Sequence, residues 1–431
     1  MLGEEEFEVV DGGLGQDGSS MYDGGMGSFH GRRGWGGGEE DDRWDHLETG
    51  MEREKERREA EGEAEGEEPD DRLVLVTGAT GLIGNAVARQ LLARGRKVRA
   101  MVRDVQRARQ CLPMACEVVR GSLGSREAIE RAMEDCSIVY HCAGLPEQWS
   151  VEASNYHNAN VQGTKNVVDV AVALDVQKLV YTSTVQVFAH QPGVSFTEAA
   201  PLGYPDANRS TATPYERSMM EAERIVLRAI KERDLPAVIL YCAPVYGPGP
   251  ASSPGLNDYI LRLSRGELSS TASPGTGGGL PLLYSEDCAR GHILAERKAT
   301  IGGRYILSDS YYTLEDIASY VRGICPSFGS SNGYHHHHSN GFGASSGSGG
   351  GGLLNQWVAQ TVSAAQEAWA TMTNGKNAVG VAPFPSAMLR YAASHALPSA
   401  EKAGSELEGW RPLTPLFEGL HDTILYSRSM M

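Results

Sequence analysis

Three glycines stand at positions 78, 81 and 84, within a run at residues 77–84 that reads TGATGLIG. A short apolar run, residues 73–76, precedes them, and a segment with helical periodicity follows. Glycines at such places allow a tight turn, a close approach of the backbone to an anion and close packing of a helix. The unpaired N–H groups at the start of that helix attract negative charge. These residues predict a loop that binds the pyrophosphate of a dinucleotide.

The end of the second predicted strand bears on which dinucleotide is bound. In proteins that bind NAD, a carboxylate about twenty residues beyond the glycines accepts the ribose 2′-hydroxyl. Here that place reads Val102-Arg103, and a guanidinium pairs well with a phosphate. Arg103 therefore favours NADP(H), with NAD as the alternative. An ordinary surface arginine is the competing interpretation.

The elements that would carry these residues alternate along the chain. Runs typical of buried strands recur at residues 73–76, 98–102, 117–119, 137–142, 178–182 and 237–241, and helical periods such as 85–94 separate most of them. This alternation predicts an α/β fold, a doubly wound parallel sheet of the Rossmann type. After residue 250 the alternation lapses, and helical patterns at 257–265 and 286–297 predict a smaller α/β substrate domain. The NAD(P)-binding domain would then cover residues 72–250 and the substrate-binding region residues 251–431.

The negative charge of the chain is concentrated in its first 71 residues. They hold 24 of the 55 acidic residues and only 7 of the 39 basic ones, so the remainder is close to neutral. A glycine-rich, charged segment of this kind cannot bury enough apolar surface to fold, and we expect a disordered tail, with a solvated helix or docking tail as alternatives. A neutral body lacks the basic surface that a nucleic acid requires, so nucleic acid is not an expected partner.

Seven cysteines without paired CxxC spacing fit neither a disulfide framework nor a zinc site, which favours a reducing compartment. His141, Cys142 and Cys288 fall in patterns of buried elements, and we interpret them as core residues. No signal, transit peptide or membrane-spanning segment is evident, so we expect a cytoplasmic protein, with peripheral membrane association left open.

A second low-complexity segment, residues 327–352, contains four consecutive histidines among glycines and serines. A metal site needs ligands held in fixed geometry, so we interpret the segment as a disordered insertion. The stretch that follows has one apolar side, formed by Leu354, Trp357, Val358, Val362, Ala365 and Trp369. It predicts a helix packed on the surface, although a membrane-surface helix or a cover over a cleft would show the same pattern.

Together the motifs resemble the extended short-chain dehydrogenase/reductases, and within them the dihydroflavonol reductases and 3β-hydroxysteroid dehydrogenases. The resemblance runs from about residue 73 to residue 426, apart from the histidine-bearing insertion. Besides TGATGLIG and VRAMVRD, it rests on YHCAG at 140–144, NVQGT at 160–164, YTSTVQVF at 181–188, PVYGPG at 244–249 and GWRPLTPLFEGL at 409–420.

The resemblance implies a catalytic group of a Ser or Thr, a Tyr, and a Lys four residues after the Tyr. Thr184 matches the hydroxyl position, with Ser183 as the alternative, and Tyr215 matches the tyrosine. The lysine position is occupied by Met219. In the family the lysine is held to anchor the nicotinamide ribose and to lower the pKa of the tyrosine, which a thioether cannot do. Arg217 would lie on nearly the opposite face of the helix and is a poor substitute.

The resemblance also implies which residues would contact the cofactor. These are Gly78, Thr80, Gly81, Leu82, Ile83, Gly84, Arg103, Ser122, Leu123, Cys142, Ala143, Gly144, Asn160, Thr182 and Tyr215. Ser122 departs from the aspartate that commonly contacts the adenine, and Tyr241-Cys242 departs from a frequent Arg-Pro. No metal is implied.

The function expected on these grounds is the NADP-dependent interconversion of a ketone and a secondary alcohol on a hydrophobic small molecule of steroid, flavonoid or terpenoid type, in the reductive direction. Met219 favours one alternative, a cofactor-binding or scaffold protein with little turnover. A sugar-nucleotide epimerase is a lesser alternative, because Val102 stands where its tightly held NAD would need an acid. The family often forms dimers, so a homodimer is a further expectation.

Overall fold

A computed structural model of the chain describes residues 71–146, 152–203, 212–250, 255–268, 278–325 and 386–429. The predicted tail up to residue 70, the histidine-bearing insertion at 327–352 and the predicted helix at 354–369 lie outside the described residues. The glycine loop and the residues around Tyr215 lie within them.

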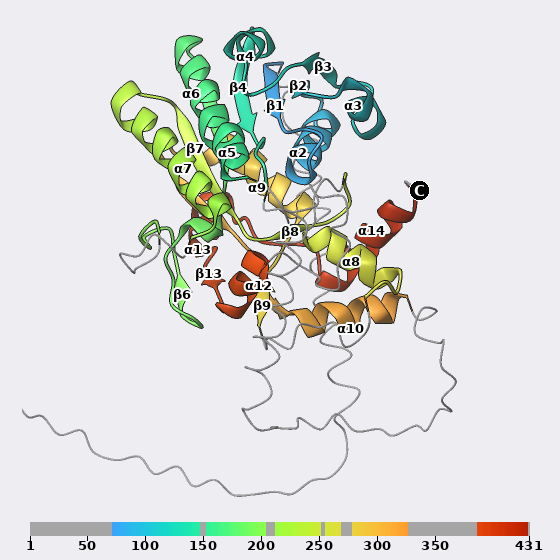
Figure 1. The fold of residues 1–431 in the computed structure, drawn as a ribbon. Helices are drawn as coiled ribbons and strands as arrows, with labels where there is room; N and C mark the ends of the chain where they lie inside the picture. Colours follow the sequence, from blue (N-terminus) through green and yellow to red (C-terminus); the bar gives the residue numbers. More distant parts are fainter. Residues whose placement is uncertain are drawn as a thin grey trace, which may run out of the picture. The chain divides into compact units, whose positions relative to one another are not determined.

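A parallel sheet organises the described part of the chain (Figure 1). Its seven strands lie in the order β11-β7-β5-β4-β1-β2-β3. Their bounds are Leu73–Thr77 for β1, Lys97–Val102 for β2, Glu117–Arg120 for β3, Cys136–His141 for β4, Lys178–Thr184 for β5, Ala237–Cys242 for β7 and Arg304–Leu307 for β11. The predicted α/β class and parallel sheet are confirmed, and each of the six predicted strands is present.

Helices cover both faces of this sheet, which explains why its strands read as continuous apolar runs. The helices are α2 (Leu82–Ala93), α3 (Val105–Cys111), α4 (Arg126–Met133), α6 (Gly163–Ala173), α7 (Pro214–Arg233) and α9 (Ser285–Lys298). Helices α4, α6 and α7 pack side by side on one face, and α2 packs against α9 on the other (Figure 1). All six residues of β7 are buried as a result.

Strand β11 was not predicted, because it follows α9 in the part of the chain where the alternation lapses. It pairs in parallel with β7 along Arg304–Leu307 and forms one edge of the sheet. The region after residue 250 therefore contributes both β11 and α9 to the sheet layers. The proposed division at residue 250 stays a prediction.

Smaller elements gather beyond the carboxyl ends of the strands (Figure 1). Helices α8, α10 and α14 pack on one another there. The helices are α5 (Ala153–Tyr156), α8 (Leu256–Ser264), α10 (Leu314–Ile324), α12 (Ser386–Ala393), α13 (Glu401–Glu406) and α14 (Leu416–Ser429). Two-residue and three-residue strands pair as β8 (Val245–Tyr246) with β10 (Leu283–Tyr284), β9 (Gly279–Pro281) with β12 (Tyr311–Thr313), and β6 (Ser195–Phe196) with β13 (Leu397–Pro398). Within the described ranges, no helix is long and apolar enough to cross a membrane.

Candidate active site

The glycine loop joins β1 to α2 in a conformation that only glycine fits well. Gly78 has a φ of +74°, and a Cβ there would lie 2.7 Å from the backbone nitrogen of Ala143. A Cβ on Gly84 would lie 2.4 Å from the carbonyl oxygen of Gly78. These approaches are closer than real Cβ contacts, so the turn, the end of β4 and the first turn of α2 can pack together only without side chains.

The N-terminus of α2 opens toward the space above this loop. Gly81 is its N-cap residue and provides no side-chain cap, and the first helical residues, Leu82 and Ile83, line a pocket. The positive end of the helix dipole and its uncapped N–H groups therefore face the pocket. This arrangement suits the pyrophosphate of a dinucleotide.

The pocket has a volume of about 300 Å³ and lies across the carboxyl ends of β1, β4, β5 and β7. In an open α/β sheet this is the edge at which ligands bind. The residues of the predicted site that line it are Gly78, Gly81, Leu82, Ile83, Gly84, Cys142, Ala143, Gly144, Asn160, Thr182, Ser183, Thr184, Tyr215 and Met219. Side chains from five separate segments of the chain thus meet at one place.

Four predicted cofactor residues do not line this pocket in the described structure. Thr80 lies in the glycine loop but outside the lining. Ser122 and Leu123 lie between β3 and α4, where the Ser122 hydroxyl accepts a hydrogen bond from Gly124 N at 3.3 Å. Arg103 follows the last residue of β2 and is exposed.

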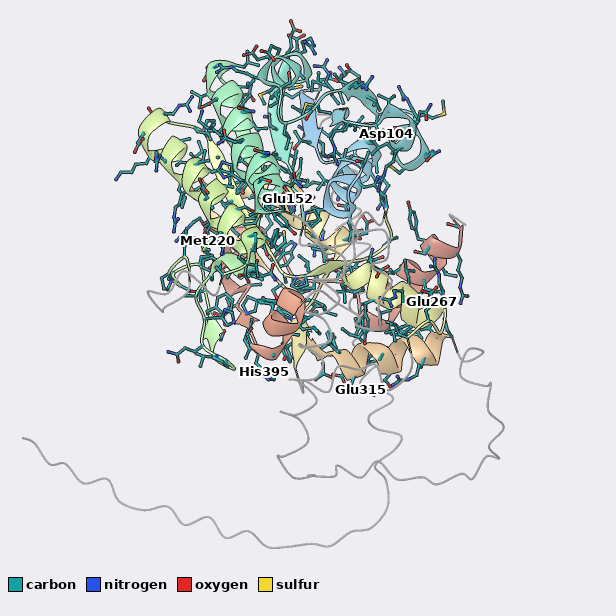
Figure 2. All side chains as sticks on the ribbon, viewed as in Figure 1. Asp104, Glu152, Met220, Glu267, Glu315 and His395 are labelled. Carbon is teal, nitrogen blue, oxygen red and sulfur yellow. The ribbon has the colours of Figure 1, made fainter. Side chains whose placement is uncertain are left out.

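Asp104, next to Arg103, is an acid that the sequence argument did not weigh. Its Oδ1 accepts hydrogen bonds from the backbone N–H groups of Gln106 at 2.9 Å and Arg107 at 3.1 Å, so it caps α3. Figure 2 shows Asp104 at the outer edge of the sheet domain. This carboxylate is engaged by the helix N-terminus, which leaves the Arg103 guanidinium as the neighbouring charged group at the end of β2.

Thr184 and Ser183 end β5 and present their hydroxyls to different surroundings. Ser183 is buried, and its hydroxyl donates to a carboxyl oxygen of Glu223 at 3.2 Å. Thr184 is half-buried and accepts a 3.3 Å hydrogen bond from Gln186 N, which leaves its own O–H available to donate. Of the two hydroxyls, that of Thr184 is the less committed to the fold.

Tyr215 lies in the first turn of α7, whose start is fixed by a capping box. Thr213 Oγ1 accepts from Glu216 N at 3.0 Å, and Glu216 Oε2 accepts from Thr213 N at 2.8 Å. The ring of Tyr215 contacts that of Tyr156 edge to face, with centroids 6.0 Å apart. The phenol is thus carried on a rigid helix end and is half-buried beside the pocket.

Met219 lies one helical turn after Tyr215, is only 8% exposed and lines the pocket. Arg217 points elsewhere, because its guanidinium donates to the carbonyl of Ala212. None of the described residues that line the pocket carries a charge. The missing lysine is therefore not replaced by another cation within this lining.

Asn160 connects three segments around the pocket. It lies in a π-helical stretch, His157–Gln162, a geometry often found at functional sites. Its Oδ1 accepts from Leu145 N at 2.6 Å, and its Nδ2 donates to Leu145 O at 3.1 Å and to Ser218 Oγ at 2.9 Å. Asn160 thereby holds the loop after β4 against the start of α7.

Glu223 is a buried acid that the sequence argument missed. It lies two turns after Tyr215 on the same face of α7, and its Oε1 accepts a 2.6 Å hydrogen bond from the phenol of Tyr241. Burial raises the pKa of this carboxyl to about 7. The spacing Tyr215, Met219, Glu223 was the signal that could have identified it.

His141, expected to be a core residue, is buried in β4. Its ring nitrogens lie 2.8 Å from Thr77 Oγ1 and 3.1 Å from Thr164 Oγ1. Burial lowers its pKa to about 4, so the ring is neutral at physiological pH.

The residues after β7 that line the pocket, such as Pro244 and Val245, were missed, although their place just beyond a strand end was a usable signal.

The chain matches the NAD dependent epimerase/dehydratase family over residues 74–307, more than half of its length. It is 28% identical over 254 residues to a protein of Synechocystis sp. provisionally named dihydroflavonol 4-reductase, and the match covers 58% of this chain and 71% of that protein. A 2-alkyl-3-oxoalkanoate reductase of Shewanella oneidensis is 31% identical over 228 residues, with 51% of this chain and 56% of the relative covered. A 3 beta-hydroxysteroid dehydrogenase type 7 of Mus musculus is 30% identical over 195 residues, with 41% and 50% covered. The chain spans about half the length of these last two relatives.

Two solved structures share the architecture. The crystal structure of gox2253 matches with a TM-score of 0.62 at 25% identity, over 84% of this chain and 99% of that one. UDP-glucuronic acid 4-epimerase from Bacillus cereus, solved in complex with NAD, matches with a TM-score of 0.58 at 18% identity, over 83% and 99%. That second likeness shows the fold alone. As the motifs predicted, the chain belongs to the NAD-dependent epimerase/dehydratase family, the extended short-chain dehydrogenase/reductases, which comprises NAD(P)-dependent oxidoreductases and epimerases.

Proposed function

We propose that this protein is an NADP(H)-dependent reductase that converts a ketone on a hydrophobic small molecule into a secondary alcohol. The observation that carries the proposal is that Tyr215, Thr184 and the glycine loop all line one pocket. A proton donor, a hydrogen-bond donor and a dinucleotide cradle at one place are what such a reaction requires.

The side chains of the pocket have separate roles in this proposal. The bound nicotinamide supplies the hydride. The Tyr215 phenol donates its proton to the substrate oxygen, and the Thr184 hydroxyl donates a hydrogen bond to the same oxygen. Reduction needs the protonated phenol, which is the form a tyrosine holds at neutral pH without help from a cation. The reductive direction is therefore the one that tolerates Met219.

An apolar substrate fits the remainder of the lining. Leu145, Pro146, Val245 and Leu256 line the pocket, and the lining lacks charge among the described residues. Val245 and Leu256 belong to β8 and to the first turn of α8, beyond the sheet. We propose that the elements after residue 250 that lie outside the sheet shape the substrate end of the pocket. The names of two relatives, a 2-alkyl-3-oxoalkanoate reductase and a 3 beta-hydroxysteroid dehydrogenase, are compatible with this class of substrate.

Met219 supports a second candidate, a protein that binds the dinucleotide but turns over little substrate. The thioether takes the place from which a lysine would act on the phenol and on the ribose of the cofactor. In that case the glycine loop still binds the nucleotide, and only the rate of the chemical step is lost. The two candidates therefore differ in turnover and agree in nucleotide binding.

The deciding experiment titrates the protein with NADPH and NADH by fluorescence and then follows NADPH oxidation against a panel of apolar ketones. We expect NADPH to bind and at least one ketone to accelerate its oxidation. Tyr215→Phe should abolish that turnover while NADPH binding is kept. Thr184→Val removes a hydroxyl at nearly constant volume and should lower kcat, whereas the matched Ser183→Ala should largely preserve it. Binding without turnover on any ketone would select the second candidate.

A further inference from the structure

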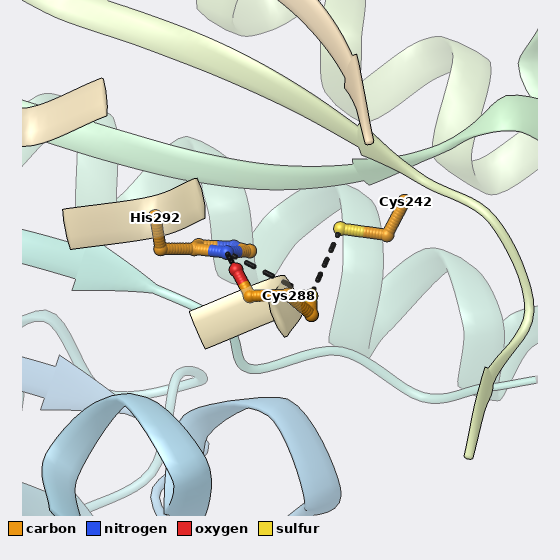
Figure 3. Close-up of side chains that lie close together, drawn as sticks. All are labelled: Cys242, Cys288 and His292. Carbon is orange, nitrogen blue, oxygen red and sulfur yellow. Dashed lines mark hydrogen bonds between the residues drawn. The ribbon is translucent and has the colours of Figure 1, made fainter. Parts of the chain in front are cut away.

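Two thiols and an imidazole lie close together next to the pocket (Figure 3), and one of the thiols, that of Cys242, also lines it. Cys242 is the last residue of β7, and Cys288 and His292 lie one turn apart on α9. The Sγ atoms of Cys242 and Cys288 are 3.6 Å apart, and Cys288 Sγ lies 3.8 Å from His292 Nδ1. All three side chains are buried, and one ligand atom from each falls within 4.8 Å of the others.

The two shorter separations are close to the edges of a metal-centred tetrahedron, and the third pair, Cys242 with His292, lies within 4.8 Å. Zinc–sulfur bonds of about 2.3 Å and zinc–nitrogen bonds of about 2.0 Å give edges of roughly 3.8 Å between two sulfurs and roughly 3.5 Å between sulfur and nitrogen. The observed 3.6 Å and 3.8 Å differ from these edges by only a few tenths of an ångström. We propose that Cys242, Cys288 and His292 form a binding site for a thiophilic divalent ion of the Zn²⁺ class, with water as the fourth ligand.

Charge favours an ion of this class. Two thiolates and one neutral imidazole offset the charge of a divalent cation, so the complex is neutral in a buried place. Sulfur and nitrogen ligands select zinc and related ions over magnesium and calcium.

The hydrogen bonds of His292 indicate which of its ring nitrogens carries the proton before and after a metal ion binds. Its Nδ1 lies 2.8 Å from the backbone oxygen of Cys288, and its Nε2 lies 2.9 Å from Thr182 Oγ1. In the free protein Nδ1 therefore carries the proton, and Nε2 accepts from Thr182. When Nδ1 binds the ion, the imidazole proton moves to Nε2, which then donates to the Thr182 oxygen. The two thiol protons are released to solvent, and no electrons are transferred.

The pocket gives the ion its route to the site. Cys242 and the neighbouring thiol of Cys142 line the pocket, whereas Cys288 and His292 lie behind them. Thr182 also lines the pocket and links the two regions, because its hydroxyl is within hydrogen-bond reach of both His292 Nε2 and Cys142 Sγ, at 2.9 Å and 3.3 Å. Metal binding is therefore a property of the nucleotide-free protein and does not depend on the proposed reductase activity.

The test is a Cd²⁺ titration of the nucleotide-free full chain, followed by the ultraviolet absorption of sulfur-to-cadmium charge transfer. The four histidines at residues 335–338 could bind metal through nitrogen, and this band does not report such binding. We expect saturation at one Cd²⁺ per chain, displacement by Zn²⁺, and release of about two protons as the thiols ionise. A folded protein without a sulfur band, or with a band that Zn²⁺ does not displace, would overturn the proposal.

Matched variants assign the ligands. Cys288→Ser and His292→Gln should each weaken Cd²⁺ binding at least about tenfold, because loss of even an outer partner of a metal site costs about 10–100-fold. Cys325→Ser, a change at another buried thiol, should leave the titration unchanged. Circular dichroism establishes that each variant is folded.

A measurement on the unmodified chain covers the case in which a variant does not fold. Zn²⁺ should protect Cys242, whose side chain lines the pocket, from alkylation, as mapped by mass spectrometry, and should leave the half-buried Cys111 reactive. Equal alkylation of Cys242 with and without Zn²⁺ would contradict the proposal.

Discussion

Tyr215 and Met219 lie one turn apart on α7 and line the same pocket, so an apolar thioether is the neighbour of the phenol. We expect Met219→Lys to raise the rate of alcohol oxidation at pH 7 at least about tenfold. A cation about 4 Å from the phenolate, at an effective dielectric constant of about 20, stabilises that charge by about 4 kcal/mol. Steady-state kinetics with NADP⁺ and a secondary alcohol would measure the effect.

Met219→Leu is the control for this change, because it keeps the volume and adds no charge. Its oxidation rate should stay near that of the unmodified protein. An equal gain in both variants would show that packing, and not charge, limits the reaction.

Gly84 approaches Gly78 so closely that a methyl group cannot be inserted. Gly84→Ala would place a Cβ 2.4 Å from the carbonyl oxygen of Gly78, so α2 must move away from the loop. We expect a loss of about 1–3 kcal/mol in the free energy of unfolding and at least tenfold weaker NADPH binding. Denaturant unfolding and fluorescence titration would measure both.

The matched control is Gly323→Ala, because a Cβ at that helical position meets nothing within 4 Å. This change should leave nucleotide binding intact and leave stability equal or slightly higher. Tight NADPH binding by folded Gly84→Ala would contradict the proposed phosphate site.

Glu223 should make stability depend on pH. Its pKa rises from an ordinary 4.5 to about 7, with burial as the largest cause and the charges of Arg304 and Arg224 acting in the opposite direction. The folded state therefore binds the proton more tightly than the unfolded state. The resulting stabilisation, about 3 kcal/mol, is complete below pH 4.5 and is lost as the pH rises through 7.

Urea unfolding at pH 5 and pH 8 would test this dependence. Between pH 5 and pH 8 the unmodified protein should lose about 1–3 kcal/mol of its free energy of unfolding through this carboxyl. Glu223→Gln has no carboxyl to ionise at this position and should not show this loss. Tyr241 and Ser183 face different oxygens of the carboxyl, so the amide oxygen can accept from one of these hydroxyls and the amide N–H can donate to the other. Glu232→Gln, at an exposed position on the same helix, controls for the change of net charge. A stability difference between Glu223→Gln and the unmodified protein that is the same at both pH values would contradict the prediction.

Arg103 should determine the preference between the two nicotinamide dinucleotides. We expect Arg103→Ala to weaken NADPH binding about tenfold or more and to change NADH binding little, because only NADPH carries a 2′-phosphate for the guanidinium. Fluorescence titration with both nucleotides measures the ratio. Arg107→Ala, a change of a nearby exposed arginine on α3, is the control. Tighter binding of NADH than of NADPH by the unmodified protein would contradict the assignment.

The sequence by itself determined the sheet and the place of the glycine loop. Continuous apolar runs such as residues 73–76 need both faces covered, and three glycines between a strand and a helix leave little conformational choice. The motifs also identified the family, matched Tyr215 to its tyrosine position and placed Met219 at its lysine position. These features are local in the chain, so their spacing carries the information.

Only the tertiary structure decided which residues meet. It joined β11 to the sheet, separated the environments of Ser183 and Thr184, and brought the thiol of Cys242 to 3.6 Å from that of Cys288, 46 residues later in the chain. It also engaged the Asp104 carboxylate in capping α3. Such relations depend on packing between distant segments, which no local spacing encodes. For that reason Cys288, which the sequence presented as a core residue, lies in the folded chain beside Cys242 and His292, at the proposed metal site.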